Sequence, residues 1–191
     1  MKTKILLVLS LLAGVAWGAG DPNKLPSGVR RVDHIKEALV EAKAQKKAVL
    51  FVLGEMVKKE GGKGNKLVLE ATQLLFQKLR GQCVLVYVDF NSERAKLGKE
   101  LPAVNAAFDS EDLKKSPIPR AVATDAAGQK FFALIPYAPP GPLGEEMLKE
   151  AKQQITDGLA GKLKTDAVGI ATTKDRQIEL PPDKKDKKTG K

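Results

Sequence analysis

The fold of this chain is decided by two apolar runs, AVLFVL at residues 48–53 and CVLVYVDF at residues 83–90. Each run has the length of one strand, and continuous apolar runs of this length are typical of strands buried on both faces. Between them, leucines and an alanine recur at helical spacing over residues 67–79 and predict an amphipathic helix. A strand, a helix and a second strand in this order predict a right-handed parallel crossover.

Further elements are predicted on both sides of this unit. Residues 21–31 contain proline and glycine and predict an extended segment, after which Asp33 is the expected N-cap of a helix that ends near Lys47. The elements expected downstream are a helix at 101–108, strands at 121–124 and 130–135 joined by a turn at 125–128, and a helix at 143–163. We therefore expect an α/β domain. Its central mixed sheet would contain the parallel crossover and a C-terminal β-hairpin, with helices on its flanks.

The N-terminus predicts export. Lys2 and Lys4 precede an apolar run over residues 5–16, and small residues follow it, which is the layout of a cleaved secretory signal over residues 1–20. A membrane anchor is the alternative, but the run is shorter than the about 20 apolar residues that span a bilayer. The mature protein is therefore expected to be secreted or periplasmic, where nucleic acid is not an expected partner.

The last nine residues are strongly basic for their length and carry +3 of the chain's formal net charge of +10. Residues 183–191 contain five lysines, two aspartates and no apolar residue, so we expect a disordered basic tail there, preceded by a C-terminal extension over residues 164–182. Such a tail predicts either a solubilising role or a weak contact with anionic lipid or glycan in the cell envelope. The domain itself is expected to span residues 32–163.

The order of elements and several short stretches resemble exported proteins of the thioredoxin-like family. The stretches that carry the resemblance are Glu37–Phe51, Val84–Phe90, Ile118–Pro119 before Asp125–Gly128, and Tyr137–Gly141 before Leu143. The resemblance implies a thioredoxin-like fold in which the bond between Ile118 and Pro119 is cis and Pro119 faces the Gly54–Met56 loop. It also implies that the residue before the proline presents backbone groups to a bound peptide; the alternative is that the cis proline only shapes the loop.

The chain departs from this family where the redox chemistry would be. The family dithiol would fall shortly after Phe51, but residues 54–65 contain no cysteine and Cys83 is the only one in the chain. Disulfide exchange needs one thiol to attack and a second to resolve the mixed disulfide. Cys83 lies within an apolar strand, so it is expected to be a buried core residue.

The function expected from these observations is a redox-inactive peptide- or protein-binding module of the cell envelope. Its binding residues would be Gly54, Glu55 and Met56 on one segment and Ile118 and Pro119 on another. The alternative is an enzyme or redox partner that uses the single thiol of Cys83. No catalytic residue, metal site or cofactor is assigned, because His34 is the only histidine and the acidic residues show no paired spacing. Gly61–Asn65 suggests a phosphate loop only weakly, since the P-loop pattern is missing.

Overall fold

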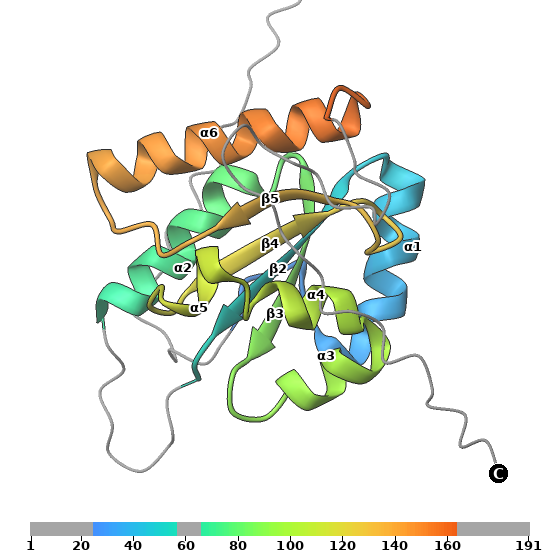
Figure 1. Ribbon diagram of the computed structural model, residues 1–191, viewed down its shortest axis with the longest axis horizontal. Helices are drawn as coiled ribbons and strands as arrows, with labels where there is room; N and C mark the ends of the chain where they lie inside the picture. Colours follow the sequence, from blue (N-terminus) through green and yellow to red (C-terminus); the bar gives the residue numbers. More distant parts are fainter. Residues whose placement is uncertain (1–24, 57–65, 164–191) are drawn as a thin grey trace, which may run out of the picture.

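The computed structural model describes residues 25–56 and 66–163, which form a five-stranded mixed sheet with helices on both faces (Figure 1). The sheet order is β1-β3-β2-β4-β5. The strands are β1 (Val29–Arg31), β2 (Ala48–Gly54), β3 (Cys83–Asp89), β4 (Arg120–Thr124) and β5 (Phe131–Ile135). The helices are α1 (Ile35–Gln45), α2 (Lys66–Leu79), α3 (Arg94–Glu100), α4 (Pro102–Ala107), α5 (Glu111–Lys114) and α6 (Pro142–Leu159).

Strand pairing follows the crossover expected from the two apolar runs. β2 and β3 are parallel, with Ala48 opposite Cys83 at one end and Gly54 opposite Asp89 at the other. β1 pairs in parallel with β3, whereas β4 runs antiparallel to β2, and β5 runs antiparallel to β4. This α/β architecture is compatible with a thioredoxin-like fold.

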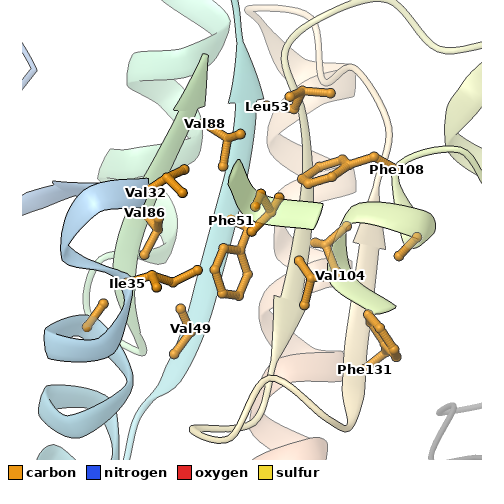
Figure 2. Packing of buried hydrophobic residues seen from close by; sticks show 14 of the residues in the cluster. Val32, Ile35, Val49, Phe51, Leu53, Val86, Val88, Val104, Phe108 and Phe131 are labelled. Atoms are coloured by element: carbon orange, nitrogen blue, oxygen red, sulfur yellow. The ribbon is translucent and has the colours of Figure 1, made fainter. Parts of the chain in front are cut away.

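Alternation along the strands divides the core between the two faces of the sheet. Val49, Phe51 and Leu53 pack on the face covered by α1, α3, α4 and α5, where Phe51 lies at the centre of the cluster in Figure 2. The intervening residues, such as Leu50 and Val52, pack on the face covered by α2 and α6. Because both faces are covered, every residue of β2 and β3 is buried, which explains the continuous apolar runs.

The start of the first helix differs from the prediction. Asp33 is not an N-cap: it lies inside a 3-10 turn, Val32–His34, and forms an ion pair with Lys96. Helix α1 begins at Ile35 with His34 before it and without a side-chain cap. Val32 is buried in the core directly after β1, so packing rather than a capping side chain sets the start of the helix.

The bounds of several other helices and strands also differ from the prediction. Val29–Arg31, expected within the extended segment, forms β1 as an edge strand beside β3. The strand expected to end at Phe90 ends at Asp89, and Phe90 is exposed. Two short helices, α3 and α5, flank α4 in the polar region where a single helix was expected. Helix α6 ends at Leu159 rather than residue 163, because the chain turns at Gly161, whose φ is +68°.

Candidate functional site

The five residues expected to bind a peptide come from segments that meet at one end of the sheet. Gly54 ends β2, and Glu55 and Met56 follow it. Because Leu53 pairs with Arg120, Ile118 and Pro119 lead into β4 beside the end of β2. The Ile118–Pro119 bond is cis, as predicted. Glu55 is exposed, Met56 and Ile118 are half-buried, and Gly54 and Pro119 are buried.

β3 brings a third segment, residues 89–93, to the same end of the sheet. Gly54 lies opposite Asp89, and its carbonyl accepts a 2.8 Å hydrogen bond from the N–H of Phe90. We call the three segments, residues 54–56, 89–93 and 118–119, the carboxyl-edge site. In open α/β sheets, ligands bind in the crevice beyond the carboxyl ends of the parallel strands, which is where this site lies.

Tyr87 explains why a glycine ends β2. A Cβ atom on Gly54 would lie 2.6 Å from both the Oη and the Cε2 of Tyr87. The tyrosine is only 4% exposed, so its ring covers the end of β2 from the α2 and α6 side. Burial, and next the negative charge of Asp89, raise the pKa of Tyr87, so the hydroxyl stays neutral at physiological pH.

Asp89 is the buried acceptor that holds the first residues after β2. Its Oδ2 accepts a 2.8 Å hydrogen bond from the N–H of Met56. Its Oδ1 accepts bonds of 2.9 Å and 2.7 Å from the N–H and hydroxyl of Ser92, and a 3.2 Å bond from the N–H of Asn91. Burial by itself raises the pKa of the Asp89 carboxyl, but these hydrogen bonds together hold that pKa below its ordinary value.

Glu93 links this acceptor to the edge strand. Its Oε2 accepts a 2.9 Å hydrogen bond from the N–H of Asp89, and its Oε1 accepts one of 2.9 Å from the Nε of Arg31. Arg31 also places its Nη1 3.0 Å from the Sδ of Met56. Both carboxylates are therefore buried and bonded, and together they fix residues 54–56 against residues 89–93.

The outer surface of the site combines an aromatic ring with polar groups. Phe90 is 39% exposed, and the guanidinium of Arg94 lies 5.9 Å from the centre of its ring. Arg94 is held in turn by bonds to Asp109 and Asn105. On the neighbouring segment, the Nδ2 of Asn91 donates a 3.1 Å hydrogen bond to the Oε1 of Glu55. This surface can offer apolar contact and hydrogen bonding side by side.

Several residues that form or support the site were not identified from the sequence, namely Arg31, Tyr87, Asp89, Phe90 and Glu93. A signal for part of this set was present, because Asp89 is the one charged residue in the run 83–90 and Glu93 follows four positions later. A charged residue at the end of a buried strand marks the point where the chain leaves the sheet. The contact of Glu93 with Arg31, 62 residues away in sequence, has no such signal.

Cys83 lies at the opposite end of β3 from this site. It pairs with Ala48, the first residue of β2, and it lies six positions before Asp89, a distance of about 20 Å along a strand. It is 3% exposed, as expected for a core residue. Burial raises the pKa of the Cys83 thiol to about 12, against a smaller lowering by Lys47. The thiol is thus neither near the site nor ionised at physiological pH.

Neither a metal-binding group of side chains nor a membrane-spanning helix occurs among the residues that the structure describes. No group of three histidine, cysteine or acidic side chains among these residues could hold a metal ion. His34 is half-exposed and pairs with Glu37 at 3.1 Å. Within residues 25–56 and 66–163, no helix is long and apolar enough to cross a membrane.

Three predictions fall on other parts of the chain. They are the signal at residues 1–20, the glycine-rich stretch Gly61–Asn65 and the C-terminal regions at 164–182 and 183–191, all of which lie outside the described residues.

Comparison of the sequence with known protein families and with curated proteins finds no significant match. The function must therefore be inferred from the geometry of the carboxyl-edge site.

Proposed function

We propose that this chain is an exported, redox-inactive thioredoxin-like protein that binds an extended peptide segment of a partner in the cell envelope. In this proposal, residues 1–20 are a cleaved signal, and β4 and β5 are the C-terminal hairpin of a thioredoxin-like domain. The bound segment lies across the carboxyl-edge site, between the Gly54–Met56 loop and Ile118–Pro119. Recognition combines main-chain hydrogen bonds with apolar contact.

The observation that carries the proposal is the exposed ring of Phe90 on a segment that buried carboxylates hold in place. Phe90 directly follows Asp89, whose N–H is bonded to Glu93, and its own N–H is bonded to Gly54. A large apolar side chain exposed on a firmly held segment loses little conformational freedom when it binds. Met56, which follows β2, and Ile118, which precedes β4, are half-buried apolar side chains at the same end of the sheet.

The properties of Cys83 weigh against the alternative of single-thiol chemistry. A reactive cysteine is partly exposed and has a lowered pKa. Cys83 has the opposite properties on both counts, since it is 3% exposed and its pKa is raised to about 12. Binding without redox turnover is the function that these residues support best.

The test is selection of linear peptides from a displayed random library on the purified mature protein. Selected peptides should bind the wild type and lose at least about fivefold in affinity for Phe90→Ala, because truncating a central aromatic contact costs more than about 1 kcal/mol. The matched control is Val40→Ala, since Val40 is an apolar side chain 69% exposed on α1, outside the site. Peptides that bind both variants equally well, or a library that yields no binder, would refute the proposal.

A further inference from the structure

Arg120 is a buried arginine at the β4 end of the carboxyl-edge site. It directly follows Pro119 and is only 6% exposed. Its register partner is Leu53, which packs on the face covered by α1, α3, α4 and α5, so the Arg120 side chain also lies on that face. Among the residues that the structure describes, no ion pair includes Arg120. A guanidinium stays charged when it is buried, and a buried charge without a partner is costly.

The hydrogen bonds of Arg120 use only one end of its guanidinium. Nη1 donates a 2.5 Å bond to the carbonyl of Leu113 in α5 and a 3.4 Å bond to the carbonyl of Ser116. Nε is buried and has no hydrogen-bond partner, and no bond within the described residues involves Nη2. The N–H groups of Nε and Nη2 point the same way from the planar guanidinium, and such a pair of donors matches the two oxygens of a carboxylate. The unused edge therefore has the geometry of a bidentate carboxylate site.

The charged side chains that act on Arg120 are Arg94 and Asp109. Burial, and next the charge of Arg94, lower the pKa of Arg120, whereas the charge of Asp109 raises it. Asp109 is already bonded to Arg94, at 3.1 Å and 2.8 Å, so one carboxylate serves two guanidinium groups. The buried carboxylates Asp89 and Glu93 are bonded elsewhere in the site. This end of the site therefore has an excess of positive charge, which a further anion would complement.

Arg94 connects this positive end to the exposed ring of Phe90, since its guanidinium lies 5.9 Å from the ring centre and its charge acts on Arg120. We propose that the peptide bound at the carboxyl-edge site carries a carboxylate, which binds the Nε and Nη2 edge of Arg120. This inference rests on the proposed function, because the peptide brings the carboxylate to the site. The carboxylate belongs to an acidic side chain or to the C-terminus of the peptide, and the two share this chemistry. Phe90 then supplies apolar contact, and Arg120 selects peptides by charge.

Synthetic peptides test whether binding depends on a carboxylate. Peptides are selected on the mature protein from a displayed random library with free C-termini and are then synthesised. In each peptide, the acidic side chains are changed one at a time to the corresponding amides, and in a separate form the C-terminus is amidated. One of these changes should weaken binding to the wild type by at least about tenfold, because breaking a buried, hydrogen-bonded charge pair is costly. The change that has this effect identifies the source of the carboxylate.

Variants of the mature protein assign the effect to Arg120. Arg120→Met removes the charge, so it should bind the carboxylate peptide at least about tenfold more weakly than the wild type, and the two proteins should bind the amide form with similar affinity. Arg120→Lys keeps the charge without the planar edge and should also bind the carboxylate peptide more weakly. It carries the test if Arg120→Met does not fold. The matched control is Arg80→Met, which removes an exposed charge between α2 and the start of β3 and should bind both forms like the wild type.

The outcomes separate this inference from the proposed function. Selected peptides that lose affinity for Phe90→Ala, but whose binding depends on no carboxylate, would overturn the inference and leave the proposed function standing. An equal effect of the amide change on the wild type and on the Arg120 variants would do the same. A library that yields no binder would overturn both.

Discussion

Glu93 accepts a 2.9 Å hydrogen bond from the backbone N–H of Asp89. Both side chains are buried, although residues 89–93 include no basic residue. The charge of Glu93 is instead balanced by Arg31 from the edge strand β1. Two carboxylates and one arginine thus join three segments that are distant in sequence. This arrangement places Phe90 and the Gly54–Met56 loop side by side at the end of the sheet.

Replacing Asp89 should destabilise the protein. In Asp89→Asn, an amide NH₂ replaces one of the two acceptor oxygens, so backbone donors at Met56 or at Asn91 and Ser92 lose a partner. An unsatisfied buried donor costs about 1–3 kcal/mol, and the free energy of unfolding in urea should fall by this amount. Asp112→Asn is the control, because Asp112 is exposed in α5. A comparable loss in both variants would contradict the role assigned to Asp89.

Asp89 should also contribute to the loss of stability in acid. The pKa of Asp89 is lower in the folded protein than its ordinary value of 3.8, so the folded state favours the ionised form. This contribution is fully present above the unfolded pKa and is lost as the pH falls through the lower, folded pKa. The free energy of unfolding, measured in urea between pH 6 and about pH 3, should therefore fall less steeply in Asp89→Asn than in the wild type. Parallel pH profiles would show that another group is responsible.

Gly54→Ala should also be destabilising, for a steric reason. The added methyl would lie 2.6 Å from two atoms of Tyr87, and overpacking of this kind costs about 1–3 kcal/mol. Gly81→Ala is a matched control, because a Cβ there meets nothing within 4 Å. Thermal unfolding should show a lowered melting temperature for Gly54→Ala alone. Tyr87→Phe should restore part of the loss in the double variant, since it removes one of the close atoms.

The two apolar runs made β2 and β3 the most predictable part of this structure. β2 and β3 are buried on both faces, so their composition alone identifies them, and the helix between them requires a crossover. The carboxyl-edge site was predicted only in part. Gly54–Met56 and Ile118–Pro119 came from a family resemblance, whereas Phe90 was assigned to the end of the buried strand because it continues the apolar run. The turn that exposes it depends on hydrogen bonds of Asp89 and Glu93, which periodicity does not report.

Cys83 should be unreactive in the folded protein. Its burial and its pKa of about 12 leave almost no accessible thiolate at pH 8. A water-soluble disulfide reagent should therefore label the thiol only after denaturant is added, and the mature protein should not accelerate insulin reduction beyond a Cys83→Ser control. Stoichiometric labelling within minutes in native buffer, or turnover above that control, would revive the single-thiol alternative.

The last prediction concerns the basic C-terminus. Residues 183–191 contain five lysines and no apolar residue, so they have nothing to contribute to the core, and removing Asp183–Lys191 should leave the melting temperature unchanged. If the tail contacts anionic envelope lipid, each lysine near the surface contributes about 1 kcal/mol, and salt screens the attraction. The truncated protein should then bind vesicles containing phosphatidylserine more weakly than the full mature chain at low salt. The difference should shrink as salt is added. A full-length variant with its five tail lysines changed to glutamine separates charge from length and should behave like the truncation. Equal binding of all three proteins would leave the tail only a solubilising role.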